Sequence, residues 1–166
     1  MTIRFALPDD LNQVAQLYYE NHIRTYRGLL PDAYISSLTT GACLSKWEHF
    51  LRDPEKKIWI AHDSRVFLGF AAGEPDPELM QTWYLASLHV VKDARGKGVG
   101  SSLIRAVGAF AAEKHYQMMS VCIVRGNDRA GELYQKLGAT HYRYFEDTFL
   151  GFPSNSEKLL WEHIPC

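Results

Sequence analysis

Three glycines separated by single residues stand in the stretch 95–101, which reads Arg-Gly-Lys-Gly-Val-Gly-Ser. The stretch lies between an apolar, strand-like run at 83–91 and a helix-like run at 102–114. Glycines leave backbone N–H groups uncovered by side chains, and a helix start adds unpaired N–H groups and partial positive charge. Such a strand-to-helix junction binds phosphate or pyrophosphate. The sequence therefore predicts a phosphorylated cofactor held at 95–101.

The spacing of the glycines excludes two common phosphate-binding patterns. The dinucleotide fingerprint requires a third glycine where this chain has Leu103. The P-loop requires a glycine where this chain has Val91, and a serine or threonine directly after the lysine, where this chain has Gly98. What the stretch does contain is the pattern Arg-x-x-Gly-x-Gly, formed by Arg95, Gly98 and Gly100.

This pattern resembles the acetyl-CoA-binding motif of the GNAT superfamily of N-acetyltransferases. The segment Leu88-His89-Val90, five residues before the arginine, is similar to the end of the family's fourth strand. The segment 127–138, Asn-x-x-Ala-x-x-x-Tyr-x-x-Leu-Gly, is similar to its downstream helix. The resemblance covers residues 87–138 by motif and the rest by element order. The stretch 26–31 also resembles a subset that includes bacterial polyamine and amino-acid acetyltransferases.

The resemblance implies acetyl-CoA as the cofactor and assigns residues to it. Backbone N–H groups at 95–100, with the helix start at Ser101, would hold the pyrophosphate, assisted by the charge of Arg95 or Lys97. The pantetheine arm would pair with the strand edge at 88–90, where the fourth and fifth strands splay apart. A backbone N–H there would stabilise the oxyanion, an interaction worth about 3–4 kcal/mol in acyl-transfer sites. Asn127 would contact the cofactor or cap its helix. The full expected set is Leu88, His89, Val90, Arg95, Gly96, Lys97, Gly98, Val99, Gly100, Ser101, Asn127, Ala130 and Tyr134.

Proton transfer requires an acid and a base. The resemblance implies that Tyr134 is the general acid that protonates the departing sulfur. Several family members carry Glu or His about eleven residues before the motif arginine, where this chain has Tyr84, and a phenol of pKa near 10 is a poor base at neutral pH. His89 is the nearest alternative, but strict alternation places it on the opposite face of the strand unless a β-bulge intervenes. Water-mediated deprotonation, Glu20 and His22 are further alternatives.

The acceptor pocket is expected between the first two helices and the loop 73–79. Its candidate substrate residues are Tyr19, His22 and Tyr26, with Tyr18 beside them. Acidic residues at 74, 76 and 78 would attract a cationic amine if they lay at the pocket, but solvated surface charges are the preferred explanation of them. The expected reaction is direct attack, in a ternary complex, by a primary amine of a small molecule, either a polyamine or an amino-acid-like compound. A protein or peptide acetyltransferase and a non-catalytic acetyl-CoA-binding module are the alternatives.

Composition sets the outer limits. A chain of 166 residues favours one domain, residues 1–166. A net charge of −1 argues against a dedicated nucleic-acid binder, and no apolar run is long enough to span a bilayer. Three widely spaced cysteines and seven scattered histidines form neither a disulfide framework nor a metal signature. We therefore expect a cytoplasmic acyltransferase without a metal, as a monomer or homodimer.

Apolar periodicity predicts the elements that must position these residues. Strands are expected at 2–6, 57–62, 66–72, 81–91, 118–124, 139–146 and 157–163. Helices are expected at 9–21, from 31 to 38, after the glycine stretch to 115 and at 127–137, with a further helical segment at 44–51. Loops are expected at 73–77 and 151–155. The unit 81–124 should be a right-handed parallel crossover, while the early strands should be antiparallel. The expected fold is a mixed α/β sheet of about seven strands with four helices, the GNAT acyltransferase fold.

Overall fold

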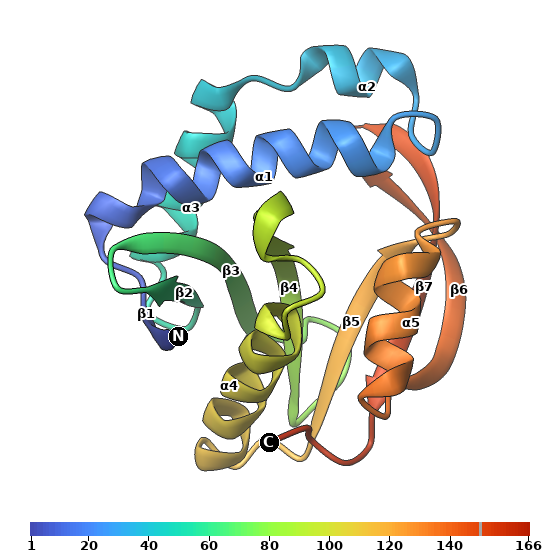
Figure 1. Cartoon of the computed structure of the whole chain (residues 1–166). Coiled ribbons are helices and arrows are strands. Elements are labelled where there is room, and N and C mark those ends of the chain that lie inside the picture. Colours follow the sequence, from blue (N-terminus) through green and yellow to red (C-terminus); the bar gives the residue numbers. More distant parts are fainter. Residues whose placement is uncertain (150) are drawn as a thin grey trace.

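The computed structural model of the chain describes residues 1–149 and 151–166. Its seven-stranded sheet has the order β1-β2-β3-β4-β5-β7-β6 (Figure 1). The strands are β1 (Thr2–Phe5), β2 (Lys57–Asp63), β3 (Val66–Pro75), β4 (Thr82–Val90), β5 (Met118–Val124), β6 (Thr140–Phe149) and β7 (Phe152–Trp161). The helices are α1 (Leu11–Tyr26), α2 (Asp32–Ser37), α3 (Thr40–Arg52), α4 (Val99–Glu113) and α5 (Asp128–Lys136), with 3₁₀ turns at Pro8–Asp10 and Lys92–Ala94. The expected mixed α/β class is confirmed.

Pairing directions follow the connections. Neighbouring strands from β1 to β4 pair antiparallel, as do β5 with β7 and β7 with β6. Among the strand pairs that the structure describes, only β4–β5, joined by the long crossover through α4, is parallel. Tight turns permit antiparallel pairs, whereas a parallel pair needs a crossover of a dozen residues or more. Both pairing predictions are therefore confirmed. Within the described ranges, no helix combines the length and apolar character needed to cross a membrane.

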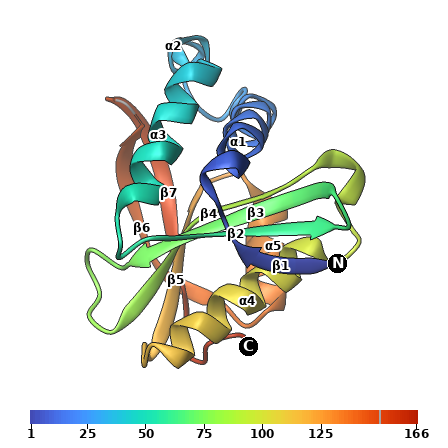
Figure 2. The same cartoon turned by 90° about the vertical axis from the view of Figure 1, so that its left-hand side faces the viewer.

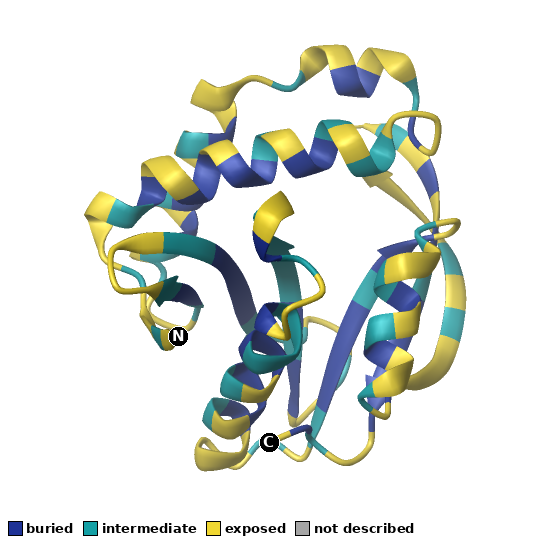
Figure 3. Ribbon diagram, in the orientation of Figure 1, coloured by how far each residue is buried: buried dark blue, intermediate teal, exposed yellow. Residues whose placement is uncertain are grey.

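Helices cover both faces of the sheet. Helices α4 and α5 pack on one face, over a core that contains Trp83, Leu103 and Met119. Helices α1 and α3 pack on the other, over a core that contains Trp47 and Phe70. The edge-on view separates the two layers (Figure 2), and α1, α3, α4 and α5 each turn a buried stripe towards the sheet (Figure 3). Apolar residues at helical spacing on one side of each helix produce this arrangement.

The sequence misplaced several element ends. The expected loop at 151–155 is wrong for residues 152–155, which pair with β6 in a long hairpin, as in Ser154 opposite Asp147. The polar run Pro-Ser-Asn-Ser resembles a turn by composition, but alternate burial of Ser154 and Ser156 shows strand periodicity. The loop at 73–77 begins only after Pro75, because β3 continues along β4. Helix α1 extends to Tyr26, beyond the expected end at 21.

Candidate active site

A cavity of about 980 Å³ passes through the sheet where β4 and β5 diverge. These two strands pair only over Thr82–Leu85 and Met118–Val121, and they separate beyond those residues. One end of the cavity is lined by the glycine stretch and the start of α5. The other end is lined by α1, α3, the end of β3 and the β6–β7 hairpin. The splayed fourth and fifth strands expected from the sequence are therefore present.

The splay leaves a free edge on β4. The Val91 N–H donates to Leu68 O in β3 at 2.9 Å. Because backbone N–H and C=O groups alternate in direction from one residue of a strand to the next, those of Leu88 and Val90 point away from β3 and into the splay. Val90 O already accepts hydrogen bonds from Arg95 Nε at 3.2 Å and Asn21 Nδ2 at 3.4 Å. The groups left for an extended, amide-rich arm are the N–H and C=O of Leu88 and the N–H of Val90.

The glycine stretch forms the expected cradle of N–H groups. Gly96 and Gly98 have φ values of 75° and 83°, in the left-handed region that favours glycine, and Gly98 immediately precedes α4. The first backbone donor of the helix is Ser102 N, which bonds to Gly98 O at 3.0 Å. The N–H groups of residues 96–101 donate to no acceptor among the described residues. Free N–H groups at a helix N-terminus fit a diphosphate.

Replacing Gly98 with alanine is expected to lower the free energy of unfolding by about 1–2 kcal/mol, the cost of a Cβ in the left-handed region. No atom lies within 4 Å of the added Cβ, so the cost is conformational. The affinity for coenzyme A should fall together with the stability, because the backbone must leave its cradle geometry to relieve the strain. Denaturant unfolding and calorimetry measure the two effects. The control is Gly41→Ala in α3, which should stabilise the chain by roughly 0.5–1 kcal/mol; equal effects at both positions would contradict the prediction.

The Arg95 side chain does not extend into the cradle. Its Nη2 donates to Asn21 Oδ1 of α1 at 2.7 Å, and its Nε donates to Val90 O. Arg95 therefore ties α1 to the end of β4 and fixes the splayed edge, and the cradle itself depends on backbone groups. Lys97 is exposed and does not line the cavity. Sequence reasoning missed the buried Asn21, whose only signal was a polar residue on the apolar face of a helix.

Helix α5 presents Asn127, Ala130 and Tyr134 to the same cavity. The Asn127 side chain makes no capping hydrogen bond, so the capping role is absent and contact with the cofactor stays a prediction. Tyr134 is 6% exposed and packs edge-on against Trp161, with ring centroids 5.7 Å apart. Burial raises the pKa of Tyr134, so its hydroxyl keeps its proton at neutral pH. A buried phenol that opens on a cavity is suited to donate a proton.

A β-bulge places Tyr84 and His89 on the same face of the sheet. Ala72 pairs with Ser87 and Gly73 pairs with Leu85, so Ala86 is the extra residue on β4. At a bulge, the alternation of side chains between the two faces of a sheet shifts by one residue. The sequence-based expectation that His89 lies opposite Tyr84 is therefore wrong, and the bulge is the physical reason.

Neither residue is a strong base. Burial, with Lys46 and Arg95 nearby, lowers the pKa of His89 to about 3, so the ring is neutral at pH 7 and binds a proton weakly. Its Nδ1 faces Asn21 Nδ2 at 3.4 Å, and since Asn21 Oδ1 already accepts from Arg95, the asparagine donates and Nδ1 accepts. Burial raises the pKa of Tyr84 well above 10, so this phenol stays protonated.

The expected substrate residues divide between two places. His22 and Tyr26 line the cavity together with Tyr18. Tyr19 lies on another side of α1, over a shallow depression that it shares with Glu20. The structure thus keeps Tyr19 and Glu20 apart from the other site residues.

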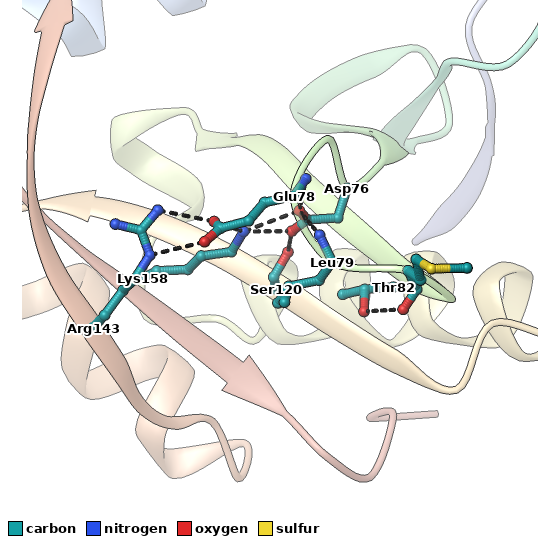
Figure 4. Close-up of polar contacts among 8 residues, drawn as sticks. Asp76, Glu78, Leu79, Thr82, Ser120, Arg143 and Lys158 are labelled. Carbon is teal, nitrogen blue, oxygen red and sulfur yellow. Dashed lines mark hydrogen bonds and ion pairs between the residues drawn. The ribbon is translucent and has the colours of Figure 1, made fainter.

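Acidic residues of the β3–β4 loop do not face an incoming amine. Asp76 is buried and pairs with Lys158 Nζ at 2.8 Å, and it also accepts from Ser120 Oγ (Figure 4). Glu78 is held by Lys158 at 3.0 Å and by Arg143 through two hydrogen bonds of 2.9 and 3.0 Å. This network fastens the loop to β5, β6 and β7. The expectation that Asp76 and Glu78 attract a cationic amine is therefore wrong, because their charges are neutralised within the protein.

Glu74 is the acidic residue of this region that does line the cavity. It lies directly opposite Tyr84 in the β3–β4 register, and directly opposed residues share one face of a sheet. Lys56 Nζ holds its Oε2 at 2.7 Å, which leaves Oε1 without a described partner. A carboxylate thus stands beside the β4 position at which the sequence offered only a tyrosine. The pairing of β3 with β4 was the signal that sequence reasoning could not supply.

The fold and this cavity are those of acyl-CoA-dependent N-acyltransferases. The model of the Acetyltransferase (GNAT) family matches residues 12–139. The chain belongs to the GNAT acetyltransferase family.

Individual relatives and structures agree with this assignment. The thialysine N-ε-acetyltransferase of Bos taurus is 36% identical over 56 residues, a segment that spans 34% of this chain and only 33% of the bovine enzyme. The crystal structure of ribosomal-protein-alanine N-acetyltransferase from Brucella melitensis superposes with a TM-score of 0.75 at 18% identity, covering 97% of this chain and 99% of that one. The structure of yncA from Salmonella typhimurium with its cofactor acetyl-CoA has a TM-score of 0.73 at 18% identity, covering 97% and 92%. The family and the fold predicted from the sequence are confirmed, and acetyl-CoA is the cofactor bound in that last neighbour.

Proposed function

We propose that this chain is a single-domain N-acetyltransferase, spanning residues 1–166, that moves an acetyl group from acetyl-CoA to the primary amine of a small molecule. The observation that carries the proposal is one continuous cavity of about 980 Å³. It joins the free N–H groups at 96–101 and the free edge of β4 to the Tyr134 hydroxyl, and it opens beyond them on polar residues of the opposite face. Three free cysteines agree with a reducing, cytoplasmic location.

The residues of the chain divide the chemistry among them. When bound, acetyl-CoA supplies a thioester whose acetyl group passes to the acceptor nitrogen as the carbon–sulfur bond breaks. The N–H groups at 96–101 hold the diphosphate, and the free polar groups of Leu88 and Val90 hold the arm. One of these strand N–H groups stabilises charge on the carbonyl oxygen. Tyr134 donates its hydroxyl proton towards the sulfur, and Glu74 removes a proton from the amine, directly or through water.

Replacing Glu74 with glutamine is expected to lower kcat by about 10²-fold, the lower end of what general-base catalysis contributes. The amide keeps the shape and the cavity position of the side chain but cannot accept a proton. Steady-state kinetics of thiol release measure the effect. Glu113→Gln at the exposed end of α4 is the matched control and should leave kcat unchanged. An unchanged kcat for Glu74→Gln would favour deprotonation through water alone.

A panel of amines assayed for thiol release from acetyl-CoA tests the proposed function. The panel contains amino acids, diamines and polyamines, together with peptides bearing free N-termini and lysines. Turnover of at least one small amine, with mass spectrometry showing an added acetyl group, is the expected result. Acetylation of peptides alone would replace the proposal with a protein acetyltransferase. Saturable acetyl-CoA binding in calorimetry without turnover of any amine would replace it with a binding module.

A further inference from the structure

The acceptor end of the cavity carries a positive charge that the protein does not neutralise. Two lysines face this end, Lys46 of α3 and Lys56. Lys56 is paired with Glu74 at 2.7 Å. Lys46 has no carboxylate within ion-pair distance among the described residues, although it lies near enough to Glu74 for that charge to act on it. The charge of Lys46 is therefore available to a ligand.

Aromatic and hydroxyl groups fix the place of the Lys46 ammonium. Its Nζ bonds to the Tyr18 hydroxyl oxygen at 3.2 Å and lies 4.9 Å from the Tyr18 ring centre and 5.4 Å from that of Trp47. Tyr18 and Trp47 are themselves buried and packed edge-on, with centroids 5.3 Å apart. These contacts use the ring faces and one hydroxyl but supply no negative charge. A rigid aromatic wall thus holds an ammonium group at the surface of the cavity.

The neighbouring His22 also lies in surroundings with few polar partners. The His22 ring lies 4.1 Å from the Tyr18 ring and 6.0 Å from the His89 ring. Both His22 nitrogens are buried, and neither makes a well-aligned hydrogen bond among the described residues, although the Tyr18 backbone lies close enough to act on the ring. Burial first, and then the charges of His89 and Lys46, lower the pKa of His22 to about 2. Lys46 thus lies near uncharged imidazole and phenol groups, and Glu74 and Asp147 are the carboxylates that line the same cavity among the described residues.

We infer that the acceptor carries a carboxylate, which binds to Lys46 with the Tyr18 hydroxyl beside it, while the amine of the same molecule lies towards Glu74. This inference rests on the proposed function, because it concerns the amine that the same cavity receives. It selects an amino-acid-like acceptor over a polyamine. A polyamine would bring several positive charges towards Lys46, whereas an amino acid offers one charge of each sign to Lys46 and Glu74.

Two matched pairs of acceptors test the inference: L-lysine with cadaverine, and L-methionine with methylthiopropylamine. The members of each pair differ only by the carboxylate. For at least one pair we expect kcat/KM to be about 10–100-fold higher for the amino acid, since a hydrogen bond to a charged group is worth about 1.5–3 kcal/mol. Both members of that pair should also be titrated calorimetrically into the protein with coenzyme A present. The amino acid should bind more tightly than its decarboxylated partner, in the absence of turnover.

Variants of Lys46 locate the effect. Lys46→Met should raise KM for the preferred amino acid by about 10–100-fold with little change in kcat, and should leave its decarboxylated partner nearly unaffected. Lys46→Arg should restore most of the preference. Lys114→Met, which removes a lysine at the far end of α4, is the control and should change KM and kcat for neither acceptor. Circular dichroism and thermal melts of each variant separate a binding effect from misfolding.

The outcomes separate the two proposals. If small amines are acetylated but the decarboxylated members react as well as the amino acids, the carboxylate inference fails and the proposed function stands. The inference also fails if Lys46→Met keeps the wild-type preference. If no amine in the four-member set or the wider panel is acetylated, the proposed function fails, and the calorimetric preference then decides whether Lys46 binds carboxylates at all.

Discussion

Replacing Tyr134 with phenylalanine is expected to lower kcat by about 10²–10⁴-fold, the usual contribution of a general acid. The ring keeps its edge-on contact with Trp161, so the α5 packing that places it should survive. Because burial raises the pKa of Tyr134, the wild-type hydroxyl carries its proton throughout the neutral range. Steady-state kinetics with a saturating acceptor measure kcat, and calorimetry should show acetyl-CoA affinity within a few-fold of the wild type.

Tyr116→Phe is the matched control for this prediction. Tyr116 packs against Trp83, with centroids 5.1 Å apart, and does not line the cavity. Loss of its hydroxyl should leave kcat unchanged. If Tyr134→Phe behaved like the control, Tyr134 would be a packing residue and the proton would reach the sulfur from water.

The cofactor end of the site was predictable because its chemistry is local in sequence. Gly96 and Gly98 take positive φ values within a short segment that also begins α4, so residue type and spacing suffice to predict the cradle. Tyr134 was singled out by the resemblance of the segment 127–138 to the family's downstream helix, and one helix, α5, carries it. In both cases the functional groups belong to one element, and its own geometry sets their relative positions.

The acceptor end was less predictable because pairing between strands determines it. The bulge at Ala86 moves His89 to the face of Tyr84, and nothing in the β4 sequence alone indicates it. Glu74 reaches the site only through its register opposite Tyr84. Lys46 comes from a helix that is far from β4 in the sequence. These are long-range relationships, and a local pattern of residue types does not contain them.

The fold shows the same division between local and long-range information. Each expected strand exists in the structure, although several strand ends differ, and the parallel crossover through α4 is present. Apolar periodicity failed at Phe152–Asn155, where polar residues form a strand because β6 pairs with them. The acids at 74, 76 and 78 had the composition of a solvated loop, yet Glu74 lies in β3 and Asp76 is buried by partners on β5 and β7. Polar strands and buried ion pairs depend on tertiary partners, so composition alone does not reveal them.

The ion network around Asp76 leads to the second large prediction, which concerns stability. Replacing Lys158 with methionine should lower the free energy of unfolding by about 3–5 kcal/mol, because the Asp76 carboxylate would be left buried without its cation. Both partners are well shielded, with side chains 5% and 0% exposed. For a chain of this size the loss corresponds to a fall in Tm of roughly 6–20 °C. Denaturant unfolding at pH 7 and thermal melts measure it.

Arg143→Met is the control within the same network. It removes the exposed pair between Arg143 and Glu78, which are 42% and 39% exposed, and should lower stability far less than Lys158→Met does.

The pH dependence of stability supplies a second check. Burial opposes ionisation of Asp76, but hydrogen bonds from Lys158, Ser120 and two backbone N–H groups prevail and lower its pKa in the folded state. The wild-type stabilisation is therefore present above the unfolded pKa of about 3.9 and is lost as the pH falls through the folded value. In Lys158→Met the unpaired carboxylate takes up a proton more readily. The difference in the free energy of unfolding between variant and wild type should therefore shrink from pH 7 to pH 4. A difference that stays constant would show that lost packing, not lost charge pairing, causes the destabilisation.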